Sequence, residues 1–232
     1  SFLTIIPSNN TDLETVARYM HVFPIIGIGI GLLIASIGFG LSFFLEPLIV
    51  ALLVVASIAI ITGIHHTDGL ADFADGLMTR GTKEKKRKAM KDLSTGSAGI
   101  VSVVLSIVGV IIALSLTTGY ELFQAILLSE ILAKFSMVLM ASIGKSAAVG
   151  SNSPFIQIMK DKRRLAAAGV ITIIPLVVIG GTTGLILFGA SLGVTLFLIG
   201  LSTRSFGGIT GDVMGAANEL TRLSSLLIFV SL

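Results

Sequence analysis

The 232-residue sequence contains no cysteine and no tryptophan, and only 12% of its residues are charged. Without cysteine, the chain has no disulfide, no thiol nucleophile and no cysteine-bound metal. The charged fraction is about half of the roughly 25% that soluble domains carry, whereas 53% of the residues are hydrophobic. Together with the mean hydropathy of +0.99, this composition excludes an ordinary soluble domain and predicts an integral membrane protein.

Long apolar runs follow one another along nearly the whole chain. At 1.5 Å per residue, a helix of about 20 residues crosses a hydrocarbon core about 30 Å thick. We therefore expect an all-α, polytopic helical bundle of about seven transmembrane helices. It forms a single transmembrane domain over residues 1–232. The expected spans are 23–45, 48–64, 100–116, 122–143, 165–179, 185–201 and 215–232.

The two ends of the sequence suggest a piece of a longer chain. It starts at Ser1 without Met and stops at Leu232 inside an apolar run, so we expect residues to be missing at the N-terminus and at the C-terminus. No signal peptide is visible.

Lysine and arginine are concentrated in alternate loops between the expected spans. Cytoplasmic loops of membrane proteins are enriched in both residues. With a cytoplasmic N-terminus, the loops after spans two, four and six are cytoplasmic, and these are the basic ones: 80–91, 145–164 and Arg204. The three opposite turns contain no lysine or arginine. The pattern supports seven spans and places both acidic stretches of the sequence on the cytoplasmic side.

An acidic stretch, HHTDGLADFADG, begins at His65, where the second span ends. At about 100° per residue, a helix places Asp68, Asp72 and Asp75 on one face, with His65 one turn earlier. Carboxylates at this spacing repel one another, so we expect a cation beside them. Either His65 or His66 is a candidate general base, and the alternative is that it only holds Asp68 by a hydrogen bond.

A second stretch, FGGITGDVMGAANE at 206–219, lies on the same side of the membrane. Glycines 207, 208 and 211 allow the backbone to approach a ligand closely. Asp212 and Glu219 are seven residues apart and share a helix face. Magnesium is usually bound by one or two carboxylates together with phosphate oxygens and water. The two stretches therefore predict a shared site on the cytoplasmic face for a metal and a pyrophosphate substrate.

The segment 80–91 carries seven basic residues: Arg80, Lys83, Lys85, Lys86, Arg87, Lys88 and Lys91. Such runs are most often solvated faces, and the alternative is that this one attracts polyphosphate or anionic lipid headgroups.

Charges at membrane depth are rare and are usually paired or functional. Lys134 follows Glu130 by one helical turn, and we interpret the two as a structural ion pair. Arg222 follows Glu219 at similar spacing.

Two glycine patterns do not predict nucleotide binding. Gly144, Lys145 and Ser146 resemble the end of a Walker loop, but the glycine required five residues earlier is replaced by Leu139. The glycines of the first span, which include Gly27, Gly29 and Gly31, follow no strand. In a membrane helix they indicate close packing, either within the chain or in a homo-oligomer.

The motifs together resemble the cobalamin synthase family, also called adenosylcobinamide-GDP ribazoletransferase. HTDGLADFADG from His66 resembles its H-x-D-G-L-A-D-x-x-D-G signature, and GGITGDVMGAANE from Gly207 resembles its G-G-x-T-G-D-x-x-G-A-x-x-E. The opening FLTIIP resembles F-L-T-x-x-P, and MKD at 90–92 with Gly96 and Gly99 resembles M-[KR]-D-x-x-x-G-x-x-G. Four motifs in this order cover nearly the whole chain.

The resemblance implies a magnesium-dependent enzyme of late vitamin B12 biosynthesis in the inner membrane. Family members join α-ribazole, or its 5'-phosphate, to adenosylcobinamide-GDP and release GMP. No nucleic acid is implied as a partner. The residues implied in metal binding are Asp68, Asp72, Asp75 and Asp212, and those implied in catalysis are His66, Asp68, Asp72 and Asp75. The residues expected to contact substrates are Arg80, Lys91, Asp92, Gly207, Gly208, Gly211 and Glu219.

Two other functions are considered. A CDP-alcohol phosphotransferase also clusters aspartates at a membrane interface, but its D-x-x-D-G-x-x-A-R spacing and its arginine after alanine are not found here. A cation transporter would distribute its acids across the membrane, whereas only Glu130 is expected near the middle of a span.

Overall fold

The computed structural model describes residues 3–4, 13–148 and 153–232. Within these residues it contains helices and no strand, which confirms the all-α prediction. The FLTIIP motif lies mostly outside the described residues. The helices are α1 (Leu13–Arg18), the short 3-10 helix η1 (Met20–Val22), α2 (Phe23–Leu41), α3 (Pro47–Thr62), α4 (His65–Met78), α5 (Lys83–Ala89), α6 (Ser97–Ser115), α7 (Gly119–Ile143), α8 (Ser153–Ile158), α9 (Lys162–Phe206) and α10 (Gly211–Phe229).

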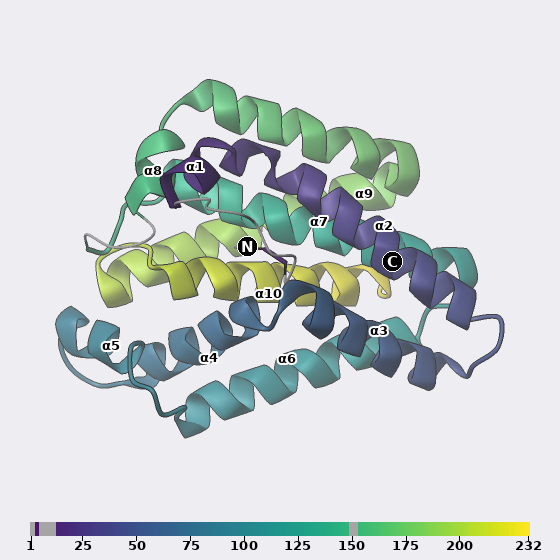
Figure 1. Cartoon of the computed structure of the whole chain (residues 1–232), viewed down its shortest axis with the longest axis horizontal. Helices are drawn as coiled ribbons and strands as arrows, with labels where there is room; N and C mark the ends of the chain where they lie inside the picture. The colour runs from purple at the N-terminus through teal and green to yellow at the C-terminus, as the bar shows by residue number, and fades with distance from the viewer. Residues whose placement is uncertain (1–2, 5–12, 149–152) are drawn as a thin grey trace.

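Helix α7 forms the centre of the bundle and packs against α2, α9 and α10, and α9 also packs against α10 (Figure 1). All its residues from 125 to 141 are buried. Helices α3, α4 and α6 form a further layer, in which α4 and α6 pack against α10. A helix that is apolar on every side is typical of the core of a large protein or of a membrane span.

The glycines of α2 confirm the packing interpretation. A Cβ at Gly27 would lie 2.8 Å from the Glu130 carbonyl oxygen, and one at Gly31 would lie 3.2 Å from Leu127 Cα. Only glycine lets α2 approach the α7 backbone this closely. A Cβ added at Gly29 or Gly40 would have no atom of another helix within 4 Å, so these two positions face open space.

Four helical segments of the described chain are long and apolar enough to cross a membrane: Met20–Leu41, α6, α7 and α9. Helices α3 and α4 pass the same test only as a pair bent by 93°, which gives up to five spans. The protein is therefore a helical membrane protein, and seven spans stay a prediction. Two features account for the difference. The 45-residue α9 is interrupted at Gly181, where the fifth and sixth spans were expected to separate, and α10 contains three charged residues.

The acidic helix begins where the sequence predicts, directly after α3. Gly63 ends α3 in the left-handed conformation at φ 69°, and Ile64 follows at φ 47°. Two consecutive left-handed residues turn the chain sharply, which explains the bend between α3 and α4. Helix α4 is thereby directed along α6 and α10 rather than continuing the α3 axis.

Candidate active site

Helices α4 and α10 touch at two glycines. A Cβ at Gly69 would lie 3.0 Å from the Asp212 carbonyl oxygen, and one at Gly215 would lie 3.2 Å from the His66 carbonyl oxygen. Neither position has room for a side chain unless a neighbour moves. The contact joins the two acidic motifs, as the sequence predicts, and it explains the glycine in each.

Electrostatic coupling shows that the carboxylates of the two helices lie near one another. Burial, followed by the charges of Asp212, Asp68 and Asp75, raises the pKa of Asp72 from 3.8 to about 6. Burial also raises the pKa of Asp212; Asp68 acts in the same direction, whereas hydrogen bonds and Lys91 oppose the shift. A group of acids that repel one another favours a bound cation.

The carboxylates provide the oxygen donors that magnesium prefers, but they do not form a complete cage. Among the described residues, no group of three or more His, Asp or Glu side chains is arranged to hold a metal ion. Magnesium commonly uses one or two carboxylates and completes its shell with phosphate oxygens and water. One or two of the carboxylates Asp68, Asp72 and Asp212 would suffice for a metal that is held jointly with a phosphate-bearing substrate, and this ligand set stays a prediction.

Asp75 has a structural contact that the sequence reading missed. Its Oδ2 accepts a hydrogen bond from the Gly96 backbone N–H at 2.7 Å, and its Oδ1 accepts one from Gly99 N–H at 2.8 Å. A Cβ on either glycine would lie 2.5 Å from the carboxylate. Asp75 thus caps the N-terminus of α6 from another helix, which explains both glycines of the M-K-D motif.

His66, one candidate for the general base, lies in the interior. The residue is 4% exposed, and neither ring nitrogen has a hydrogen-bond partner in the described part of the chain. Its electrostatic neighbours are Lys134, Arg222 and His65. His65, by contrast, is exposed on the face that carries Asp68 and Asp72.

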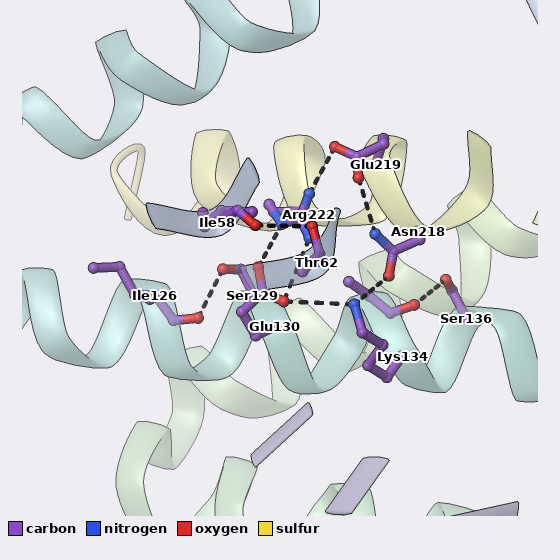
Figure 2. Close-up of polar contacts among 11 residues, drawn as sticks. Ile58, Thr62, Ile126, Ser129, Glu130, Lys134, Ser136, Asn218, Glu219 and Arg222 are labelled. Atoms are coloured by element: carbon purple, nitrogen blue, oxygen red, sulfur yellow. Dashed lines mark hydrogen bonds and ion pairs between the residues drawn. The ribbon is translucent and has the colours of Figure 1, made fainter. Parts of the chain in front are cut away.

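A buried ionic network lies beneath the acidic cluster and joins α7 to α10 (Figure 2). Arg222 donates from Nη1 to Glu219 at 2.6 Å and from Nε to Glu130 at 2.5 Å. Lys134 Nζ lies 3.6 Å from Glu130 and donates to the Asn218 side-chain oxygen at 2.7 Å. These contacts confirm that Glu130 and Lys134 are a structural pair, and they also tie Glu219, expected to contact substrate, into the network.

The basic helix α5 is more than a solvated face. Lys86 Nζ donates to the Leu77 carbonyl at 2.8 Å, near the end of α4. Arg87 Nη1 donates to the Phe206 carbonyl at 2.6 Å, at the end of α9. Cations at helix C-termini satisfy free carbonyls and interact favourably with the helix dipole. The two bonds dock α5 across both helix ends, a role that the charge run alone does not reveal.

The remaining predicted residues of this region are exposed. Arg80 lies in the segment between α4 and α5. Asp92 accepts hydrogen bonds from the Ser94 backbone N–H at 3.1 Å and from its hydroxyl at 2.7 Å, and these bonds lower the pKa of Asp92. The hydrogen bonds of Asp92 thus lie within its own loop. The charge of the neighbouring Lys91 acts on Asp212 and lowers its pKa.

The glycine loop before α10 is clamped to the segment after α7. Gly207 ends α9 at φ 88°, and a Cβ at Gly208 would lie 2.3 Å from the Lys145 carbonyl oxygen. Ile209 N–H donates to Lys145 at 2.7 Å, and Ala147 N–H donates to Ile209 at 3.0 Å. The Gly144–Lys145–Ser146 pattern, excluded as a Walker loop, therefore supports the glycine loop and so the start of α10, where Gly211 lies.

These features define a polytopic membrane protein with clustered carboxylates beside basic segments, as in enzymes that act on phosphate-bearing substrates. The family described as cobalamin-5-phosphate synthase matches residues 1–230, and the chain belongs to this family of transferases.

Similar proteins cover nearly the whole chain. A protein of Methanocella arvoryzae is 35% identical, over 97% of this chain and 91% of its own length. One of Pyrococcus abyssi is 36% identical, over 98% and 94%, and one of Archaeoglobus fulgidus is 34% identical, over 97% and 92%. Each is named adenosylcobinamide-GDP ribazoletransferase. No solved structure matches.

Proposed function

We propose that this protein transfers the adenosylcobinamide phosphate group of adenosylcobinamide-GDP to α-ribazole, or to its 5'-phosphate, and releases GMP. The product is adenosylcobalamin or its 5'-phosphate, so the reaction assembles the nucleotide loop of cobalamin. The observation that carries the proposal is the Gly69–Gly215 contact, which brings the carboxylates of α4 against Asp212 in a chain of this family.

In this reaction a hydroxyl of the ribazole attacks the phosphorus that bears the cobinamide. A new P–O bond forms, the P–O–P bridge breaks, and GMP leaves with the negative charge. Catalysis of such a transfer is mostly a matter of alignment and of neutralising charge on the phosphate oxygens. Magnesium held by Asp68, Asp72 and Asp212 would neutralise that charge when bound.

The hydroxyl proton must move to a group at the acidic face. We propose that a carboxylate of this face that does not bind the metal accepts it, since a carboxylate crowded by other acids is more basic than an isolated one. His66 is better suited to a supporting role: its ring is buried beside Lys134 and Arg222. Lys91 is proposed to hold a phosphate oxygen, and the support is that its charge acts on the pKa of Asp212.

The active site is proposed to face the cytoplasm. The support is the distribution of lysine and arginine, since basic α5 contacts the end of α9 and the 144–147 segment pairs with the glycine loop that leads into α10. The proposed location is the cytoplasmic membrane.

A turnover assay on the purified protein in liposomes tests the proposal. We expect GMP and a cobamide to form together from adenosylcobinamide-GDP and α-ribazole, and both to disappear when magnesium is chelated. Formation of neither product by a folded protein would refute the proposed reaction. CDP-alcohol substrates and cation flux, measured on the same sample, then test the two alternatives.

A further inference from the structure

Cationic residues from two separate segments lie against the glycine loop 207–210. On one side, the position of a Cβ on Gly207 lies 3.5 Å from Arg87 Nη1 and 3.6 Å from Lys83 Cδ. On the other side, the loop pairs with the backbone of 145–147, and the Lys145 side chain is exposed. The loop contains no charged residue itself, and it lies between the Lys83 and Arg87 side chains of α5 and the backbone of the segment that carries Lys145.

The two cations of α5 differ in how they are engaged. The Arg87 guanidinium is committed to the Phe206 carbonyl and, at 3.3 Å, to Glu84. Lys83 has no hydrogen bond or ion pair with any described residue, and its aliphatic stem lies over Gly207. Because Arg87 and Lys86 fix α5 in place, the position of Lys83 over the loop is held by the fold.

The loop leads directly to the acidic cluster. The Thr210 hydroxyl accepts the Val213 backbone N–H at 3.2 Å, capping α10, and donates to Asp212 at 3.4 Å. The loop therefore connects Gly207, which lies beneath the Lys83 side chain, to Asp212 at the start of α10. Only a few residues separate the two positions.

A diphosphate donor requires two such neighbouring environments. One phosphorus is attacked beside the carboxylates, and the other, one bridging oxygen away, leaves with the nucleotide. We propose that Lys83 and Lys145 bind the phosphate that stays on the nucleotide, both in the donor and in the released GMP. This inference rests on the proposed function. Lysine serves as a point charge for phosphate, and its attraction grows as the leaving phosphate gains negative charge.

The experiment compares Lys83→Gln and Lys145→Gln with two matched lysine variants. Lys85→Gln changes the same helix, but the Lys85 side chain lies over Gly81 rather than over the loop. Lys160→Gln changes another exposed lysine of the 145–164 region. Lys83→Gln and Lys145→Gln are called the loop variants. We expect each of them to raise the KM for adenosylcobinamide-GDP and the inhibition constant of GMP about tenfold, which is the change in affinity expected when one hydrogen bond to a charged group is lost. The KM for α-ribazole should stay unchanged, as should all constants of the two controls.

Equilibrium dialysis of radiolabelled GMP provides a readout that does not need turnover. We expect about tenfold weaker GMP binding in both loop variants. Loop variants that bind GMP as tightly as the controls, or a wild-type protein that binds no GMP, would overturn the inference. Failure of the proposed function is distinct, because it appears as absent cobamide in the wild-type protein whatever the dialysis shows.

A lipid headgroup offers the same phosphate chemistry as a nucleotide, so both assays are run in two kinds of vesicle. In vesicles of phosphatidylcholine alone, the loop variants should show the full loss. An effect found only in vesicles with anionic lipid would assign the two lysines to headgroups and contradict the nucleotide assignment.

Discussion

The substitution Asp72→Asn should stabilise the metal-free protein while abolishing its activity. In the folded chain the pKa of Asp72 is raised from 3.8 to about 6, because burial and three neighbouring carboxylates disfavour its charge. A pKa difference of about two corresponds to about 3 kcal/mol of unfavourable free energy at neutral pH. Since Asp72 is partly exposed, solvent screening reduces the usable figure to about 1 kcal/mol.

The sign of the pH dependence follows from the direction of this shift. The folded state binds the Asp72 proton more tightly than the unfolded state. The contribution of this protonation to the free energy of unfolding is therefore fully present below pH 3.8 and is lost as the pH rises through about 6. Asparagine carries no charge at any pH. The variant should therefore match the wild type at pH 4 and exceed it at pH 7.5.

Thermal unfolding in detergent with a chelator present measures this difference. For a chain of this size, about 1 kcal/mol corresponds to a Tm increase of about 2 to 4 °C for Asp72→Asn at pH 7.5. Glu46→Gln, an exposed residue whose side chain makes no helix-capping bond, should leave Tm unchanged. A Tm for Asp72→Asn that is unchanged or lower at pH 7.5, or a gain that persists at pH 4, would refute the reasoning.

Three further predictions concern the residues that support the cluster. Asp75→Ala should lower the free energy of unfolding by about 1 to 3 kcal/mol, since two backbone N–H groups at the start of α6 lose their acceptor. A lower Tm in thermal unfolding would show this loss. Glu130→Gln should cost about 3 to 5 kcal/mol, because it leaves buried Lys134 without a carboxylate partner and Arg222 with Glu219 alone. Size-exclusion chromatography in detergent should show aggregation, and a monodisperse variant with wild-type Tm argues against the network. Gly69→Ala should reduce turnover by on the order of tenfold or more with unchanged helical circular dichroism, because α10 must move away from α4; full turnover contradicts the role of the contact.

Much of the fold could be predicted from hydropathy and helical periodicity. The break in α9 at Gly181 and the Glu130–Lys134 pair are local features, and each is found where it was expected. Helix α3 ends at Thr62, two residues before the expected end of the second span. The approach of Asp72 to Asp212 was also expected, because each motif combines acids with glycines that permit close contact.

Contacts that depend on how each helix is rotated against its neighbours were not predictable. Periodicity shows that Asp72 and Asp75 share a face, but it does not show that Asp75 meets the start of α6. It likewise does not show that His66 turns inward, nor that Arg87 reaches the end of α9, 119 residues away in sequence. In a chain that is apolar on most faces, hydropathy carries little information about which face meets which partner.

The most direct test of the joint metal and phosphate site is pulsed electron paramagnetic resonance of bound Mn²⁺, used in place of Mg²⁺. With adenosylcobinamide-GDP present, a hyperfine coupling between Mn²⁺ and the diphosphate ³¹P nuclei is expected in the wild-type protein, and it should be lost in Asp72→Asn and in Asp212→Asn. A wild-type protein that binds the donor without any ³¹P coupling, or an undiminished coupling in both variants, would contradict the assignment of these carboxylates.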